Sequence, residues 1–567
     1  MPVQISYPGV YIDEVKSSVR TITGVPTSIA AFVGWAPRGP ADGPVHITSW
    51  ADYEMQFGGL HPDSPMSYAV EQFYRNGGAE AEIVRVVASP AAGEEAPVLP
   101  IGKKPKTGTD TRPTLAPIGP GAWAQNLTAR VEGIEDDNDR TKDKKGVYNL
   151  TLTDTGTGVE ETYLNVSTDP DSPRSLRRVL AVSQLVTWVD DGTKPPEKND
   201  PEPEDDQEPE DDDQPSDGNG SADDDTEGDA PAGPRGLRRR NAGAKDLVSK
   251  VENVPTKDEL PGLEDYKGDP VRKTGLQALL KADIVNILCI PDATEKLNDS
   301  DCKDLVKAAA EFCREHRAVV LVDPPGAWNQ PATTAGDVAD SARTLPVTGD
   351  PARNAAVYFP RVLATDLPRG GLVRDFPPCG VMAGVLARTD AQRGVWKAPA
   401  GTDASLNGVQ GLEMPLTDLE NGRLNQLGVN CLRELPAVGP VAWGARTMRG
   451  NDQLTDEWKY LPVRRLALFV EESLYRGTQW VVFEPNDEPL WASIRLNIGA
   501  FMNSLFREGA FQGRTPAEAY LVKCDRENNP QNDIDRGIVN IQVGFAPLKP
   551  AEFVIIHIQQ LAGQVQV

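Results

Sequence analysis

Two uninterrupted apolar runs constrain the fold of this chain most strongly. They are IVNILCIPD at residues 284–292 and RAVVLVDPP at residues 317–325, and SDCKDLVKAAAEFCREH between them is typical of a helix. A strand without polar alternation is buried on both faces, as parallel strands are when helices cover both sides of their sheet. The order strand, helix, strand therefore predicts an α/β layer with a doubly covered parallel sheet.

The same order of elements occurs near the N-terminus. SIAAFVGWAP at residues 28–37 and AEIVRVVAS at residues 81–89 are predicted strands. The segment 64–78 between them is a predicted helix, because Ser64 is a favourable N-cap and Pro65 suits the first helical position. We expect both regions to belong to one α/β core, which is interrupted by an insertion.

The insertion spans about residues 91–250 and differs from its surroundings in composition. It contains short segments with strand-like alternation, such as GVYNLTLTD and ETYLNVST. Between residues 200 and 229 it carries 16 acidic residues and no basic one, so of the net charge of −26 only −26 + 16 = −10 belongs to the rest of the chain. We interpret residues 190–243 as an exposed, solvated spacer. The acidic balance argues against direct binding to nucleic acid.

The C-terminal third has a different pattern. Residues 487–508 are predicted to form a helix capped by Asn486 or Asp487, with one apolar stripe. WVVFEP before this helix and AYLVKCD, GIVNIQVGFAP and AEFVIIHIQQ after it are predicted strands. The last of these is apolar on both faces, which is typical of a strand inside a sheet.

A search for catalytic chemistry centres on PPCGVMAGVLARTDAQRGVWKAPAG at residues 377–401. Here Cys379 lies in what we interpret as a glycine-rich loop, followed by Arg388, Asp390 and Arg393. A cysteine nucleophile needs a base and an orienting group, and no histidine is near in sequence. We therefore favour a buried structural cysteine and a polar network in the core or at a subunit contact.

Other sites are not indicated by the sequence. The four histidines show no metal-ligand spacing, and the chain has no Walker A loop, GxGxxG fingerprint or GxSxG elbow. The six cysteines contain no CxxC pair and are expected to be buried free thiols. No apolar run is long enough for a membrane span, and no signal peptide is evident. We expect no cofactor, no membrane insertion and synthesis in the bacterial cytoplasm.

Several segments together resemble contractile tail sheath proteins, which form the outer sleeve of contractile phage tails and of related extracellular injection systems. In chain order they are YPGVYIDEV, GAWAQNLTARV, the segment 377–401, LGVNCLRELPAVGPVAWGARTM, YLPVRRLALFVEESL and LVKCDRENNPQNDIDRGIVNIQVGFAPLKPAEFVIIHIQQ. The second match is partial, because Ala124 and Gln125 replace the Gly of the family pattern. The resemblance covers most of the chain outside residues 91–250.

The resemblance implies a multidomain α/β subunit with an α/β core, an inserted β-rich outer domain, an α+β C-terminal domain and extended strand arms at both ends. The expected boundaries are an N-terminal arm at 1–25, the core at 26–90 and 251–435, the insertion at 91–250, the C-terminal sheath domain at 436–548 and a C-terminal arm at 549–567.

The resemblance also implies sites of assembly. The strand arms that would pair with neighbouring subunits include Tyr7, Val10, Tyr11, Ile12, Phe553, Val554, Ile555, Ile556 and Ile558. Possible contacts to an inner tube are Arg495 and Arg507, on the helix 487–508. Possible lattice or core contacts are Arg388, Asp390, Arg393, Trp443 and Arg446.

The function implied is structural and mechanical rather than enzymatic. Copies of the chain would stack as hexameric rings around an inner tube, with baseplate and terminal cap proteins as further partners, and would contract from a metastable state. Two alternatives stay open: a soluble hydrolase with a subtilisin-like α/β core, and a non-contractile tube or surface-layer protein. The sequence favours an injection system over a phage tail only modestly.

Overall fold

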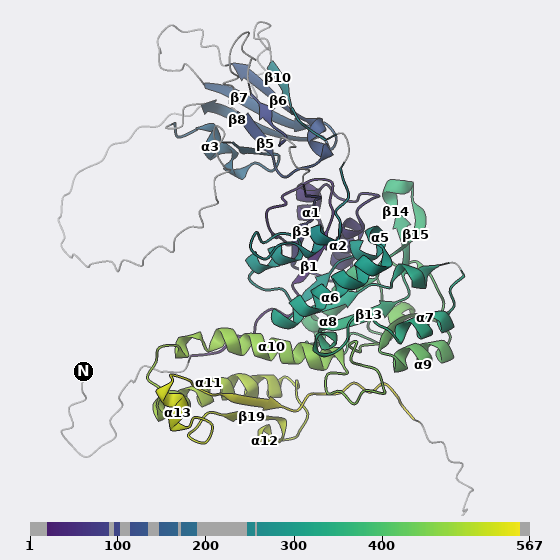
Figure 1. The fold of residues 1–567 in the computed structure, drawn as a ribbon, viewed down its shortest axis with the longest axis vertical. Helices are drawn as coiled ribbons and strands as arrows, with labels where there is room; N and C mark the ends of the chain where they lie inside the picture. The colour runs from purple at the N-terminus through teal and green to yellow at the C-terminus, as the bar shows by residue number, and fades with distance from the viewer. Residues whose placement is uncertain are drawn as a thin grey trace, which may run out of the picture. The chain divides into compact units, whose positions relative to one another are not determined.

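The structure is a computed structural model that describes residues 20–89, 96–101, 114–133, 147–167, 172–189, 247–255, 258–330 and 332–555. It has mixed α/β architecture and divides into two compact units (Figure 1). The first unit comprises Met1–Glu94, Gly119–Gly121 and Lys257–Val567, and the second comprises Glu95–Ile118 and Ala122–Thr256.

The first unit is built on an eight-stranded sheet with the order β18-β17-β13-β12-β11-β1-β3-β2. Its strands are β1 (Ala30–Gly34), β2 (Val45–Ile47), β3 (Ala81–Arg85), β11 (Ile287–Cys289), β12 (Val319–Val322), β13 (Ala355–Phe359), β17 (Val429–Leu435) and β18 (Gly439–Ala442). All neighbours pair in parallel except the two outer pairs, β2 with β3 and β17 with β18. The predicted parallel layer is confirmed, and β11 and β12 are the two apolar runs that indicated it.

Helices cover both faces of this sheet. They are α1 (Trp50–Phe57), α2 (Pro65–Arg75), α4 (Leu263–Lys267), α5 (Asp292–Lys296), α6 (Asp299–Glu315), α7 (Ala335–Ala342), α8 (Cys379–Arg393) and α9 (Asp418–Gln426). Alternate residues of β1 belong to different apolar clusters: Phe32 packs with residues of α2 and α8, and Val33 packs with residues of α6 and α7. This two-sided burial explains why the strands carry no polar alternation.

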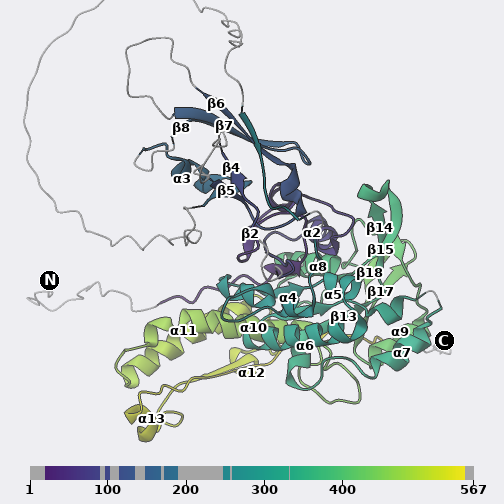
Figure 2. The same cartoon turned by 45° about the horizontal axis from the view of Figure 1, so that its top comes forward.

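The C-terminal part forms a further layer of the first unit. It consists of α10 (Leu461–Gly477), α11 (Glu488–Arg507), α12 (Pro516–Ala519), α13 (Gln531–Asp535) and the antiparallel pair β19 (Tyr520–Lys523) and β20 (Gln542–Phe545). Helices α10 and α11 lie side by side in both views (Figures 1 and 2). Leu468 of α10 joins the core of the main sheet, whereas Val470 packs with Ile494 of α11, so α10 connects the two layers.

Shorter elements complete the first unit. A three-stranded sheet has the order β15-β14-β16, with bounds Leu372–Phe376, Val362–Asp366 and Gly411–Leu412. The 3-10 helices are η3 (Gly275–Lys281), η4 (Gly326–Asn329), η5 (Asp350–Asn354), η6 (Leu367–Arg369) and η7 (Gln479–Val481).

The second unit is β-rich and has its own core. A four-stranded sheet has the order β10-β6-β7-β8 and a three-stranded sheet has the order β4-β5-β9. The elements are β4 (Leu99–Pro100), β5 (Thr114–Pro117), η1 (Ala122–Asn126), β6 (Leu127–Gly133), β7 (Val147–Asp154), β8 (Val159–Ser167), α3 (Leu176–Val179), η2 (Leu180–Val182), β9 (Val186–Trp188) and β10 (Leu247–Lys250). Val98 and Glu252 exchange two backbone hydrogen bonds, so the entering and leaving segments of this unit pair with each other.

Two sequence predictions about local structure are wrong. The segment 377–401 is not a glycine-rich loop, because its first half is the buried helix α8. A Cβ at Gly380 would lie 2.3 Å from the carbonyl oxygen of Ala69, and one at Gly384 would lie 2.6 Å from that of Phe73. These glycines therefore permit close packing against α2 rather than turns.

The second correction concerns WVVFEP, which is not a strand. Gln479–Val481 form the 3-10 helix η7, and Phe483 after it has a left-handed backbone with φ 72°. The predicted helix N-cap at Asp487 is confirmed, since its side chain accepts a hydrogen bond from the N–H of Leu490. Within the described ranges, no helix is both long and apolar enough to cross a membrane.

Candidate assembly site

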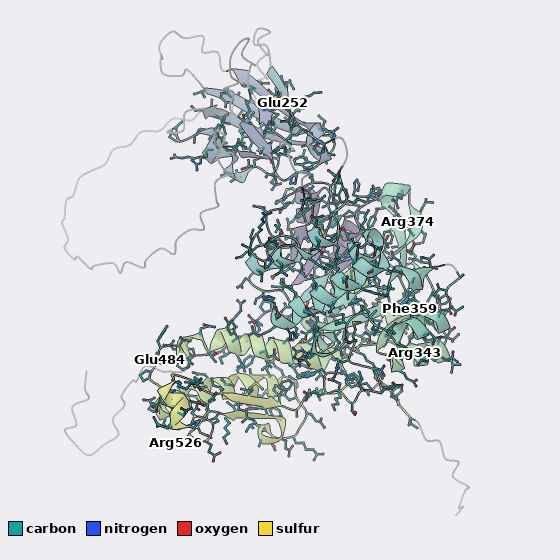
Figure 3. The ribbon with its side chains drawn as sticks, in the orientation of Figure 1. Glu252, Arg343, Phe359, Arg374, Glu484 and Arg526 are labelled. Carbon is teal, nitrogen blue, oxygen red and sulfur yellow. The ribbon has the colours of Figure 1, made fainter. Side chains whose placement is uncertain are left out.

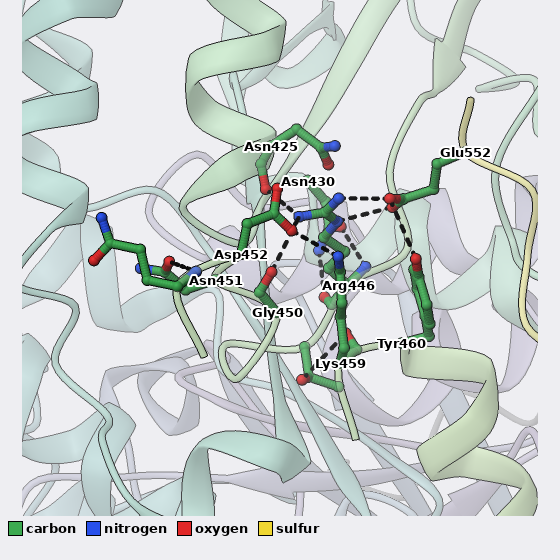
Figure 4. A network of polar contacts seen from close by, with 11 residues as sticks. Asn425, Asn430, Arg446, Gly450, Asn451, Asp452, Lys459, Tyr460 and Glu552 are labelled. Atoms are coloured by element: carbon green, nitrogen blue, oxygen red, sulfur yellow. Dashed lines mark hydrogen bonds and ion pairs between the residues drawn. The ribbon is translucent and has the colours of Figure 1, made fainter. Parts of the chain in front are cut away.

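The side chain of Arg446 is the centre of a buried polar network near the C-terminal end of the described chain (Figure 4). Its position is fixed by Asn430 of β17, a strand of the main sheet. The Arg446 N–H donates to Asn430 Oδ1 at 2.6 Å, and Asn430 Nδ2 donates to the Arg446 carbonyl at 2.8 Å. The backbone of Arg446 is thus held on both sides by one amide side chain.

The guanidinium of Arg446 uses all of its nitrogen atoms. Nε donates to Glu552 Oε1 at 2.8 Å and Nη2 donates to Glu552 Oε2 at 2.5 Å, which makes a bidentate pair. Nη1 donates to Asp452 Oδ1 at 2.9 Å and to the carbonyls of Asn425 at 2.8 Å and Gly450 at 3.0 Å. We call Arg446 and Glu552 the C-terminal root.

The charges around this root stabilise one another. Burial alone would lower the pKa of Arg446, but the hydrogen bonds and negative charge of Glu552, together with Asp452, raise it above its ordinary value. Burial would raise the pKa of Asp452, but hydrogen bonds and positive charge from Lys459 and Arg446 lower it. The Tyr460 hydroxyl also donates to Glu552 Oε2, at 3.4 Å. The network therefore fixes the chain at residue 552 by several hydrogen bonds and one buried ion pair.

Beyond the C-terminal root the chain leaves the body. Phe553, Val554 and Ile555 are exposed and are in neither a helix nor a strand. A groove of about 950 Å³ lies beside them, lined by Trp396, Trp443 and residues 548–553 among others. The strand predicted for AEFVIIHIQQ is therefore absent over the described residues 551–555 of the isolated chain, and Ile556 and Ile558 lie outside the described residues.

A second buried ion pair holds the segment that follows the N-terminal arm. Arg465 of α10 donates to both carboxylate oxygens of Asp390 on α8, at 2.9 and 2.6 Å, and both side chains are buried. Thr27 joins them: its hydroxyl donates to Asp390 Oδ2 at 2.8 Å, and its carbonyl accepts from Arg465 Nη2 at 2.9 Å. We call Thr27, Asp390 and Arg465 the N-terminal root.

The chain before this root runs along α10 and α11. The N–H of Val25 donates to the Ser473 hydroxyl, and the N–H of Arg20 donates to Asn497 Oδ1 at 3.1 Å. The Arg20 guanidinium lies 5.0 Å from the ring centre of Trp480, a cation–π distance. The predicted arm residues Tyr7, Val10, Tyr11 and Ile12 lie outside the described part of the chain.

The two arginines predicted in the segment 377–401, Arg388 and Arg393, do not share a network with Asp390 in the described structure. Arg388 donates to the carbonyls of Asn76 and Ser405, at 3.1 and 2.6 Å. Arg393 lies at the surface, where its guanidinium is 3.7 Å from the Asp403 carboxylate. Arg388 is thus a core contact, and only Arg393 is placed for a contact outside the subunit.

The two arginines predicted to face a tube differ in their surroundings. Arg495 is held within the subunit, because it donates to Glu488 at 2.7 Å and to the carbonyl of Cys524. Arg507 is exposed in the last turn of α11. A contact between these residues and another protein stays a prediction.

Cys379 has no feature of an activated nucleophile. It lies at the start of α8 in the core, and its N–H donates to Asp323 Oδ1 at 2.9 Å. Burial raises the pKa of the Cys379 thiol well above its ordinary value, so the thiolate is disfavoured. The chain has six cysteines, and all six are buried and free in the structure.

The antiparallel pair β19 and β20 is the third element relevant to assembly. Each strand pairs with the other, and within the described residues neither pairs with a further strand. Val522 and Val543 pack on the core of the C-terminal layer, whereas Leu521 is exposed. An isolated two-stranded sheet with open edges is a site at which further strands can add.

Sequence reasoning selected Arg446 and Asp390 but missed their partners. Glu552 is 106 residues from Arg446, and Arg465 is 75 residues from Asp390. No local pattern indicates contacts at such separations. The only available signal was that each partner lies in a segment that resembles the same family.

Comparisons with known proteins show which family the chain resembles. Residues 267–448 match the phage tail sheath protein central domain, and residues 453–560 match the phage tail sheath C-terminal domain. The tail sheath protein of Vibrio phage KVP40 is 27% identical over 182 residues, which are 32% of this chain and 26% of the phage protein. The chain therefore aligns with only about a quarter of that relative's length.

Two solved structures share the fold across nearly the whole chain. The helical sheath of the anti-feeding prophage in its contracted state is 21% identical with a TM-score of 0.53, covering 98% of this chain and 99% of that one. The contracted PVC sheath of an extracellular contractile injection system is 20% identical with a TM-score of 0.52, covering 99% of each chain. The chain belongs to the contractile tail sheath protein family.

Proposed function

We propose that this chain is the structural subunit of a contractile sheath. It polymerises with further copies of itself as stacked hexameric rings around an inner tube, and contracts from a metastable extended state to drive the tube through a target envelope. The observation that carries the proposal is the combination of two arm roots fixed by buried arginines with an open two-stranded sheet. The contracted states of the two similar sheaths support the contraction.

Strand addition would join the subunits. The arm residues 7–12 and 553–558 contain the β-branched and aromatic side chains that favour extended chain. Within the described residues β19 and β20 pair only with each other, so a strand from another copy could add to this sheet through backbone hydrogen bonds. Each copy would therefore both donate arms and receive them.

Contraction would then be a change between two packings of the same lattice. The bodies rotate and move outward while the arms keep neighbours joined, and the roots transmit force because one fixes its arm to the main sheet and the other fixes its arm to helices α8 and α10. The work comes from new contacts between subunits rather than from a chemical reaction. The protein acts as a structural component and not as an enzyme.

Further partners follow from this role. The inner tube would contact the C-terminal layer, with Arg507 and Arg495 as candidate residues, and baseplate and terminal cap proteins would contact the ends of the polymer. Assembly would take place in the bacterial cytoplasm before the particle is released. The chain is similar both to phage tail sheath proteins and to sheaths of injection systems, so the proposal covers either kind of particle.

Electron microscopy of the purified full-length chain, alone and with its tube protein, tests the proposal. We expect hollow, regularly striated tubes. Deletion of residues 1–19 or of residues 553–567 should abolish the tubes while leaving a folded monomer, because both deletions remove only the arms beyond their roots. Dispersed monomers from the unchanged chain under both conditions would refute the proposed function.

A further inference from the structure

Phe483 is presented to solvent in an unfavourable backbone conformation. Its side chain is fully exposed, with a relative exposure of 103%, and its φ of 72° lies in the left-handed region. A bulky residue rarely adopts this conformation, because its Cβ then clashes with the backbone. Strain of this kind is usually retained where it serves a function. The neighbouring Val482 is also exposed, so the two form an apolar projection that we call the Phe483 knob.

The loop that carries the knob is held rigidly from both sides. Before it, the N–H of Val482 donates to the carbonyl of Gln479 at 3.2 Å. After it, Asn486 donates to the carbonyl of Ile538 at 3.0 Å and accepts from Trp491 Nε1 at 2.9 Å. Because the backbone on both sides of Phe483 is fixed, little backbone entropy is lost when its side chain binds, which is the property of an interface anchor.

The position of the N-terminal arm indicates what the knob meets. Arg20 stacks on Trp480, which is three residues before Phe483, and Figure 3 labels the adjacent Glu484 at the end of the α10 and α11 layer. Residue 12 is eight residues before Arg20, so an extended chain between them spans at most about 29 Å. If residues 7–12 add to a sheet of a second copy, as the proposed function requires, that copy must lie within this reach of the knob.

We infer that the Phe483 knob is a body-to-body contact with a second copy of this chain, made beside the donated N-terminal arm. The inference rests on the proposed function for the presence of that copy. Strand addition alone would join two subunits only through the extended N-terminal arm. A direct contact at Phe483 would also fix the orientation of one subunit relative to the other. The contact would enter an apolar surface of the neighbour, because Phe483 and Val482 offer no hydrogen-bond donor or acceptor in their side chains.

Replacement of Phe483 by glycine separates assembly from folding. Glycine adopts a positive φ without strain, so F483G should unfold at the same or a higher urea concentration than the unchanged chain. Its concentration for half-maximal sedimentation of polymer should rise at least about tenfold, as expected for an interface anchor. V271A is the matched control, because Val271 is also exposed and apolar, and it should change neither quantity.

Photocrosslinking identifies the occupant. The full-length chain with p-benzoylphenylalanine in place of Phe483 is irradiated as polymer, with and without the tube protein, and we expect an adduct between two copies under both conditions. An adduct only to the tube protein, or polymer formation by F483G equal to that of the unchanged chain, would overturn this inference and leave the proposed function standing. Failure of the unchanged chain to polymerise under either condition would overturn both.

Discussion

Replacing Arg446 by methionine is expected to lower the free energy of unfolding by about 3 kcal/mol. The methionine fills much of the same volume, so the cost comes from polar groups that lose their partner. Asp452 keeps Lys459 as a partner at 2.6 Å, and Glu552 can turn toward solvent. The carbonyl of Gly450 stays buried without a donor, at about 1–3 kcal/mol. The carbonyl of Asn425 keeps the N–H of Gly428 at 3.0 Å but loses its hydrogen bond from Arg446, at about 1 kcal/mol.

Replacing Glu552 by alanine should have a different effect. Arg446 then keeps Asp452 and both carbonyls, and water from the groove that Glu552 lines can reach the Nε and Nη2 donors, so we expect a loss of only about 1 kcal/mol. The C-terminal arm, however, loses its attachment to the main sheet. E552A should therefore assemble poorly although it folds nearly as well as the unchanged chain, whereas R446M should be impaired in both respects.

Two measurements distinguish these outcomes. Urea unfolding gives the stabilities, with E527A as a control that removes an exposed ion pair to Lys523 and should cause no measurable loss. A nitroxide label on A551C reports the root, since all six native cysteines are buried and the introduced thiol alone reacts readily. The label should become several-fold more mobile in E552A. Unchanged label mobility in E552A, or an R446M stability equal to that of E527A, would refute this account of the root.

Three further variants test the packing and the electrostatics of the first unit. G380A should lower the free energy of unfolding by about 1–3 kcal/mol, because its Cβ would come within 2.3 Å of the Ala69 carbonyl oxygen. G422A on α9 should raise the free energy of unfolding by up to about 1 kcal/mol, because a Cβ there meets no atom within 4 Å. Urea midpoints of G380A and G422A that move in the same direction would contradict this account. Burial raises the pKa of Asp292 to about 6 in the folded chain. The stabilising contribution of the protonated carboxyl to the free energy of unfolding is therefore complete below about pH 4 and is lost as the pH rises through about 6. D292N should therefore gain stability relative to the unchanged chain between pH 4 and pH 7, and a difference independent of pH in urea unfolding would contradict this.

The parts of the fold that the sequence predicts are those with a local physical signal. The apolar runs that became β11 and β12 are interpretable because burial on both faces removes polar alternation from the run itself. The start of α11 is interpretable because Asp487 caps the helix with a side chain only three residues from its donor, Leu490.

The wrong predictions have a common physical origin. Gly380 and Gly384 look like turn residues in isolation, and only the approach of α2 shows that they permit helix packing. Val481 and Val482 favour a strand locally, but tertiary hydrogen bonds of Asn486 fix the following loop in a conformation that ends any extended chain. In both cases a partner distant in sequence decides the structure.

In the proposed polymer, the two roots would hold each donated arm by polar contacts at its base, to which the buried Ile22 adds an apolar contact at the N-terminal side. An arm that adds to a sheet of another copy needs its own apolar side chains for that sheet, so they are not free to fasten it to the body from which it departs. A buried arginine instead fixes the base of each arm. Arg446 binds Glu552 directly before the exposed Phe553. Arg465, paired with Asp390, binds Thr27 after the N-terminal arm. The desolvation of each arginine is offset only when every donor is satisfied in fixed geometry, which makes the attachment point specific. In the proposed polymer, the apolar side chains at the end of the arm would stay available to the neighbour, and force on the arm would pass through a few short hydrogen bonds into the first unit.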